Sequence, residues 1–122
     1  MIFIEYPKCS TCQKAKKWLD ANGFVYEDRH IQEDPPTATE LKTWWTQSGL
    51  PLKRFFNTSG RLYKSMQLKE KLPTMDEAEQ LALLASDGML VKRPILVDGN
   101  RVLVGFREAE WEQLKSSGEG VR

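Results

Sequence analysis

The sequence contains very little cysteine and histidine, with two cysteines and one histidine in 122 residues. A structural zinc site takes four ligands, so zinc is the weaker interpretation of the cysteines and we expect no metal. The one histidine, His30, follows a predicted strand in a polar loop and is interpreted as an ordinary surface residue.

The sequence also lacks long apolar runs and an excess of charge of one sign. No stretch has the length needed to cross a bilayer, and the first residues lack the features of a signal peptide. We therefore expect a cytoplasmic protein, in a compartment where thiols are largely reduced. The formal net charge is +1, so no overall field would attract nucleic acid or a membrane, and we expect neither as a direct partner.

What the chain does contain is enough apolar sequence for a packed core. Its residues are 40% hydrophobic and 29% charged, a balance typical of a folded chain rather than a disordered one. The length suits a single domain over residues 1–122. We expect a frayed tail over Ser116–Arg122.

Four segments rich in strand-forming residues predict a four-stranded sheet. The predicted strands are 1–6, 24–29, 95–97 and 102–104. The last two flank Asp98-Gly99-Asn100, and apolar runs around Asp-Gly are a strong hairpin signal.

Helices are predicted between and after these strands. Three Ser/Thr residues followed three positions later by Glu or Gln form capping-box patterns, which mark helix starts. The three pairs are Ser10 with Gln13, Thr37 with Glu40, and Thr74 with Glu77. The first of these helices should bury Ala15, Trp18 and Leu19 and turn Lys14, Lys16 and Lys17 to water. The third should bury Ala78, Leu81, Ala82 and Ala85, which follow helical spacing. A last helix is expected over 107–114, anchored by Trp111 and Leu114.

The order strand, helix, strand, several helices, hairpin, helix predicts an α/β protein with a thioredoxin-like fold. The first strand–helix–strand piece suits a parallel pair, and the hairpin adds antiparallel strands. We expect a mixed four-stranded sheet with helices on both faces and a helical insertion at about 37–88.

The motif Cys9-Ser10-Thr11-Cys12 stands at the start of the first predicted helix. Free N–H groups and the helix dipole lower the pKa of a cysteine there, which favours Cys9 as the attacking thiolate. Cys12 lies one turn on and can attack a mixed disulfide on Cys9, so it is the expected resolving or sensing thiol. The alternative is that both are structural core cysteines.

Arg93 and Pro94 precede the third strand. In a thioredoxin-like fold, a proline at this place is cis and faces the redox cysteine, where its backbone can receive a thiol partner. The simpler alternatives are a proline that only starts the strand and an arginine held in an ordinary ion pair.

Taken together, these motifs resemble the ArsC/Spx family of thioredoxin-fold proteins, which includes glutaredoxin-linked arsenate reductases and the Spx regulators. The resemblance rests on four segments that span nearly the whole chain: 6–15, 56–60, 92–95 and 104–106.

The resemblance implies roles for individual residues. Cys9 matches the catalytic cysteine of the reductases, and Arg93 matches one arginine of their oxyanion site, where a planar guanidinium can bind an anion. Asn57 stands where a further arginine is expected, and Arg107 is the nearest match to another. The predicted catalytic residues are therefore Cys9, Cys12 and Arg93. The residues predicted to bind a substrate or partner are Lys8, Ser10, Thr11, Pro94, Asn57 and Arg107.

Three functions follow as hypotheses. The first is an enzyme, a thiol–disulfide oxidoreductase resembling arsenate reductases, with glutathione, glutaredoxin or thioredoxin as reductant and no bound cofactor. The second is an Spx-like regulator that binds RNA polymerase and responds to a Cys9–Cys12 disulfide. The third is an interaction module without turnover. The segments 56–60 and 105–106 are closer to the reductase-like branch, which favours the enzyme.

Overall fold

The computed structural model of the chain describes residues 1–116, so the predicted tail lies, after its first residue, outside the described residues. The chain forms two compact units. One combines Met1–His30 with the chain from Arg93 on, and the other is Ile31–Lys92. The helical insertion predicted at about 37–88 falls within the second unit. That both units make one domain stays a prediction.

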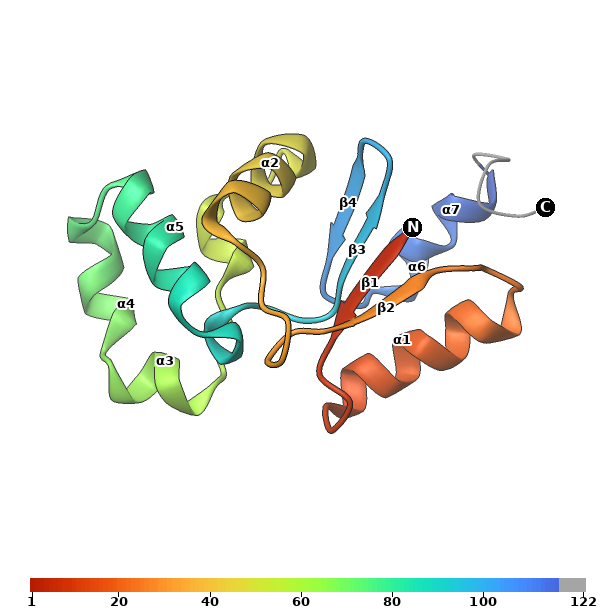
Figure 1. Cartoon of the computed structure of the whole chain (residues 1–122), viewed down its shortest axis with the longest axis horizontal. Helices are drawn as coiled ribbons and strands as arrows, with labels where there is room; N and C mark the ends of the chain where they lie inside the picture. The colour runs from red at the N-terminus through yellow and green to blue at the C-terminus, as the bar shows by residue number, and fades with distance from the viewer. Residues whose placement is uncertain (117–122) are drawn as a thin grey trace. The chain divides into compact units, whose positions relative to one another are not determined.

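The first unit contains a four-stranded mixed sheet (Figure 1). Its strands are β1 (Ile2–Glu5), β2 (Glu27–His30), β3 (Ile95–Asp98) and β4 (Arg101–Val104), in the order β2-β1-β3-β4. β1 runs parallel to β2 and antiparallel to β3, which pairs antiparallel with β4. The predicted thioredoxin-like α/β fold and the predicted hairpin are confirmed.

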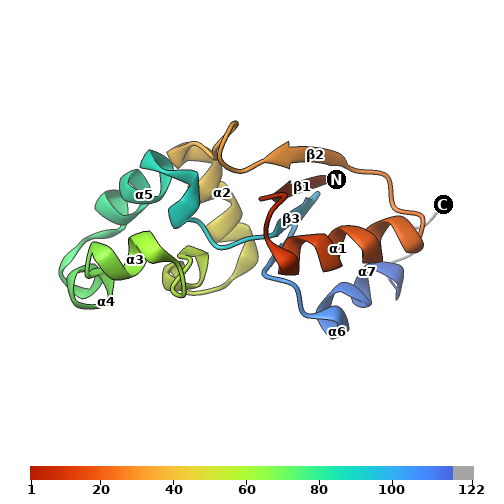
Figure 2. The ribbon, with the colours of Figure 1, turned by 90° about the horizontal axis from the view of Figure 1, so that it is seen from below.

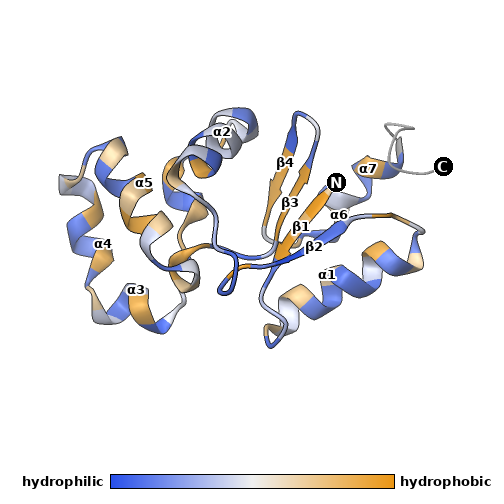
Figure 3. Cartoon of the chain, in the orientation of Figure 1, coloured by the Kyte–Doolittle hydropathy of each residue, from blue (hydrophilic) through white to orange (hydrophobic). Residues whose placement is uncertain are grey.

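The second strand begins later than predicted. The sequence indicated a strand over 24–29, but β2 starts at Glu27. Phe24 is buried instead in the core beside the first helix, where it stacks on Trp18 with ring centroids 5.6 Å apart. β2 is a hydrophilic edge strand, in contrast to the apolar β1 and β3 beside it (Figure 3).

Three helices cover one side of this sheet (Figure 2). They are α1 (Ser10–Ala21), α6 (Glu108–Trp111) and α7 (Gln113–Ser116). Between them and the sheet lies a core formed by Phe3, Ala15, Trp18, Leu19, Phe24, Leu96, Trp111 and Leu114. The predicted anchors Trp111 and Leu114 are fully buried, and the Trp111 indole N–H donates to the carbonyl of Gly105 at 3.1 Å. The last predicted helix is therefore present, divided into two short pieces.

The second unit is helical apart from one isolated β-bridge. It begins with α2 (Ala38–Ser48), where Thr37 and Glu40 form the predicted capping box. The later elements are a 3₁₀ turn at Leu52–Phe55, α3 (Arg61–Ser65), α4 (Leu68–Lys71), a 3₁₀ turn at Leu72–Thr74, α5 (Glu77–Ser86) and a 3₁₀ turn at Gly88–Leu90.

The capping box predicted for α5 was wrong by two residues. The N-cap is Asp76, whose side chain accepts from the Glu79 N–H at 2.8 Å, while Glu79 accepts from the Asp76 N–H. Thr74 ends the preceding 3₁₀ turn, and its hydroxyl donates to the Lys71 carbonyl instead.

The predicted buried face of α5 was also partly wrong. Leu81 and Leu84 are the buried residues, whereas Ala78 and Ala82 are exposed. Leucine removes more apolar area from water than alanine, so the helix turns Leu81 and Leu84 inward. Within residues 1–116, no helix combines the length and the apolar composition that a bilayer crossing requires.

Candidate active site

The two cysteines lie where β1 leads into α1. Cys9 is the N-cap residue of α1, in an extended conformation with φ −83° and ψ 124°. Its N–H donates to the Tyr6 carbonyl at 2.9 Å, which closes the connecting turn. Cys9 is partly exposed and Cys12 is fully buried, and both are free thiols. The site thus presents one accessible sulfur with a second behind it.

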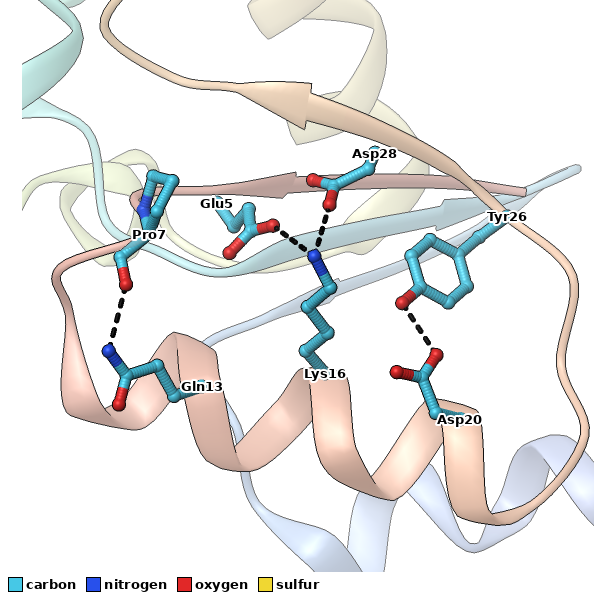
Figure 4. A network of polar contacts seen from close by, with 7 residues as sticks. All are labelled: Glu5, Pro7, Gln13, Lys16, Asp20, Tyr26 and Asp28. Carbon is cyan, nitrogen blue, oxygen red and sulfur yellow. Dashed lines mark hydrogen bonds and ion pairs between the residues drawn. The ribbon is translucent and has the colours of Figure 1, made fainter.

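The helix begins at the predicted place but by a different contact. Ser10 and Gln13 do not form the predicted capping box, because Cys9 and not Ser10 occupies the N-cap. The Gln13 side chain donates instead to the Pro7 carbonyl at 2.9 Å (Figure 4), which ties the connecting loop to the first turn of the helix.

This N-cap position favours a thiolate at Cys9. The neutral thiol makes no capping hydrogen bond, so the free N–H groups of the first turn are available to an anion. Partial burial opposes ionisation, but the N–H and thiol of Cys12, the N–H of Thr11 and the charge of Arg93 outweigh it. Together they hold the pKa of Cys9 below its ordinary value.

Cys12 has the opposite electrostatic environment. Burial is the main cause that raises the pKa of Cys12, to about 12, although the Tyr6 backbone N–H counteracts it. The hydrogen bond to Cys9, the negative charge of Cys9 and that of Glu5 raise it further. One helical turn therefore separates a thiol poised to ionise from one held neutral.

Arg93 and Pro94 lie at the same end of the sheet as the cysteine motif, because β1 and β3 are antiparallel with Ile4 opposite Ile95. The Arg93–Pro94 peptide bond is cis, as predicted. The buried Pro94 accepts a hydrogen bond from the Gly105 N–H at 2.8 Å. The Arg93 guanidinium carbon lies 5.3 Å from the centre of the Tyr6 ring. The structure thus places this pair at the end of the sheet where the thiols lie, and the charge of Arg93 acts on Cys9.

Lys8, Ser10 and Thr11, the other predicted binding residues of the motif, are exposed around Cys9. Arg107 is exposed at the N-cap of α6, and no contact among the described residues joins it to either cysteine. Asn57 belongs to the second unit, where its N–H donates to the Leu90 carbonyl at 2.8 Å. The binding roles of these residues remain predictions.

A polar network between α1 and the sheet was not predicted from the sequence. Glu5, the last residue of β1, is only 2% exposed. The Lys16 ammonium lies 3.5 Å from the Glu5 carboxylate and 2.7 Å from that of Asp28 (Figure 4). Lys16 was expected to face water. It is half-buried instead, because a buried carboxylate on the strand needs a partner.

Within this network the two carboxyl groups titrate apart. Burial, followed by the hydrogen bond and charge of Asp28, raises the pKa of Glu5 to about 7, against the opposing charge of Lys16. Burial also opposes ionisation of Asp28, but its bonds from Glu5 and Lys16 keep its pKa below the ordinary value. Glu5 therefore exchanges its proton near neutrality, whereas Asp28 stays ionised there.

Two periodicities could have indicated this network. Side chains alternate along a strand, so Glu5 faces the same side as Phe3, toward α1. Residues four apart share a helix face, so Lys16 follows Cys12. Among residues 1–116, no three side chains of histidine, cysteine, aspartate or glutamate are grouped so that they could hold a metal ion.

Comparison with known proteins supports these assignments of fold. The model of the ArsC family matches residues 4–114. The uncharacterized protein YusI of Bacillus subtilis (strain 168) is 56% identical over 113 residues, covering 93% of this chain and 96% of the relative. The regulatory protein MgsR of the same organism is 31% identical over 114 residues, covering 93% and 89%.

Solved structures of ArsC-related proteins are similar to this chain as well. The crystal structure of an ArsC family related protein from Bacteroides fragilis matches with a TM-score of 0.90 and 59% identity, covering 93% of this chain and 95% of that one. The crystal structure of a possible arsenate reductase from Streptococcus mutans UA159 matches with a TM-score of 0.86 and 47% identity, covering 93% and 96%.

Proposed function

The chain belongs to the ArsC family, and we propose that it is a thiol–disulfide oxidoreductase in which Cys9 attacks and Cys12 resolves. One observation carries the proposal: two thiols one helical turn apart have pKa values shifted in opposite directions. A structural pair of core cysteines has no need of an exposed, acidified member. Reactive cysteines combine partial exposure with a lowered pKa, as Cys9 does.

The proposed reaction has two exchange steps. The Cys9 thiolate attacks one sulfur of a substrate disulfide, forms a mixed disulfide and releases the other sulfur as a thiolate. Cys12 then loses its proton and attacks the Cys9 sulfur. The Cys9–Cys12 disulfide forms, the second substrate thiolate leaves, and two electrons have passed from the protein to the substrate.

The surroundings of Cys9 fit this sequence. Arg93 supplies a permanent positive charge that stabilises the thiolate, and it can also bind an anionic group of the substrate. Lys8, Ser10 and Thr11 are exposed around the sulfur and are available to the partner. The backbone at Pro94 is the proposed place for an extended thiol partner. No metal or bound cofactor is needed in this scheme.

An external thiol must return the protein to its reduced form. Glutathione with glutaredoxin, or thioredoxin, is the proposed reductant. Arsenate is the first oxyanion to test, because one similar structure is that of a possible arsenate reductase. Asn57 takes the place of an arginine expected in the reductases, and this makes disulfide substrates the better assignment.

A redox-sensing regulator is the second candidate, favoured by the similarity to the regulatory protein MgsR. In this function the same Cys9–Cys12 disulfide would form under oxidation and change the affinity for RNA polymerase.

An activity assay combined with a binding assay distinguishes the oxidoreductase from the regulator. Arsenate and a disulfide substrate are each tested with glutathione plus glutaredoxin and with thioredoxin, using the Cys9→Ser variant as control. Turnover that requires Cys9 supports the enzyme. No turnover, together with redox-dependent binding of purified RNA polymerase, would replace it with the regulator.

A further inference from the structure

Glu5 is a buried carboxyl group that the two exchange steps leave unused. It is the one charged residue among the buried polar residues of the described chain. It ends β1, next to Tyr6, whose backbone N–H interacts with the Cys12 sulfur. A carboxylate at this depth is costly, and pairing with Lys16 compensates for only part of the cost.

Glu5 is the last residue of β1, and Cys12 lies in the first turn of α1, the helix that packs against this strand. Cys12 and Lys16 are four residues apart, on one face of α1, and Lys16 reaches the Glu5 carboxylate at 3.5 Å (Figure 4). The negative charge of Glu5 acts on Cys12 directly, since it raises the pKa of that thiol. The carboxyl group is therefore near enough to the buried thiol for its charge to act on it.

We infer that Glu5 accepts the proton that Cys12 loses when it attacks the mixed disulfide on Cys9. The inference rests on the proposed function. In this step the Cys12 S–H bond breaks, its proton passes to a Glu5 carboxylate oxygen, the Cys9–Cys12 bond forms and the substrate thiolate leaves. In the reverse direction, when an external thiol reduces the disulfide, protonated Glu5 returns the proton to the departing Cys12 sulfur.

The proton transfer from Cys12 to Glu5 depends on whether Cys9 is a free thiolate or part of a mixed disulfide. In the reduced protein, the Cys9 charge and the hydrogen bond between the thiols are among the causes that keep Cys12 protonated. A mixed disulfide at Cys9 removes both. Burial then remains as the main barrier, because it keeps bulk hydroxide and buffer away from the sulfur. A neighbouring carboxylate is the remaining route for the proton.

The other groups around Glu5 keep it able to accept a proton near pH 7. From α1, Lys16 favours the charged form, while from β2, Asp28 favours the protonated form. His30 and Tyr26 act one step further out, through Asp28. A general base works best when its pKa lies near the working pH.

A coloured aromatic disulfide reagent tests the inference with the full chain. The first aromatic thiolate is released when Cys9 attacks, and the second is released when Cys12 resolves, so two phases report the two steps separately. We expect Glu5→Gln to leave the first phase unchanged and to slow the second at least about tenfold at pH 7. Glu27→Gln, an exposed carboxyl on β2, is the matched control and should change neither phase.

An unaltered second phase in folded Glu5→Gln protein would overturn the inference. The wild-type pH profile gives a test that requires no variant. Its second phase should rise through an inflection near the Glu5 pKa of about 7, and a second phase without one would also overturn it. Failure of the proposed function looks different: no first phase, or a second phase that survives Cys12→Ser.

Discussion

The Arg93 guanidinium carbon lies 5.3 Å over the centre of the Tyr6 ring. This cation–π contact joins the residue before the cis proline to the loop that leads into the cysteine motif. Tyr6 follows β1 and Arg93 precedes β3, two strands that are neighbours in the sheet but far apart in the sequence. The contact holds the positive charge near Cys9, where it helps to lower the pKa of the thiol.

Replacing Arg93 should therefore destabilise the thiolate form of Cys9. In Arg93→Ala, the pKa of Cys9 rises because its stabilising charge is lost, and the alkylation rate at pH 7 falls several-fold. Arg93→Lys keeps a charge but loses the planar stacking, so an intermediate rate is expected. Iodoacetamide kinetics over a pH series measure both. Identical profiles for wild type and Arg93→Ala would refute the electrostatic role.

The two thiols should differ in reactivity within one molecule. At pH 8, the thiol of Cys12→Ser should be alkylated faster than a free cysteine, because the pKa of Cys9 is lowered. The thiol of Cys9→Ser should react at least about tenfold slower than a free cysteine, because burial raises the pKa of Cys12 and excludes the reagent. Peptide mass mapping checks which sulfur carries the label. Equal rates in the two variants would count against the division of roles.

Glu5 should make stability depend on pH. Its pKa is raised from 4.5 to about 7 in the folded protein, so the folded state binds more protons than the unfolded state between these values. Its contribution to stability is full at low pH and decreases as the pH rises through this range. Glu5→Gln removes this loss. The difference in unfolding free energy between the Glu5→Gln variant and wild type should therefore shift in favour of the variant by about 1–3 kcal/mol from pH 4 to pH 8.

Urea unfolding at both pH values measures this difference, with Glu27→Gln as the exposed control. A relative stability of Glu5→Gln that does not change with pH would show that Glu5 titrates normally.

The N-cap of α5 offers a test of the helix start. Asp76→Ala removes the capping side chain and should cost about 1 kcal/mol of unfolding free energy. Thr74→Ala, at the position predicted from the sequence, loses only an exposed bond to the Lys71 carbonyl and should cost less. Thermal unfolding of both variants compares them. A larger cost at Thr74 would place the cap there after all.

The sequence predicted the sheet, the hairpin, the cis proline and the position of the thiols because each has a local signal. It failed where two local signals overlap. Thr74 and Asp76 each precede a glutamate by three residues, and only the 3₁₀ turn at Leu72–Thr74 decides between them. The second strand was predicted to start too early for a similar reason, since Phe24 suits both a strand and a core.

Glu5 shows a different limit. A glutamate at the end of a predicted strand is usually solvated, and its burial depends on Lys16 and Asp28, which come from two other elements. The Ser10–Gln13 pattern also misled, because Cys9 takes the N-cap position. At the candidate site the helix therefore starts from the reactive cysteine and not from the residue that capping preference favours. Departures from local sequence rules are expected at functional sites.

Trapping of the mixed disulfide tests most directly whether Cys9 attacks and Cys12 resolves. Each reduced protein is mixed with glutathione disulfide and its intact mass is followed with time. Cys12→Ser should accumulate one glutathione on Cys9, Cys9→Ser should accumulate none, and wild type should lose two hydrogens as the Cys9–Cys12 disulfide forms without a lasting adduct. Equal glutathione adducts on both single variants, or a stable adduct on wild type, would contradict the account.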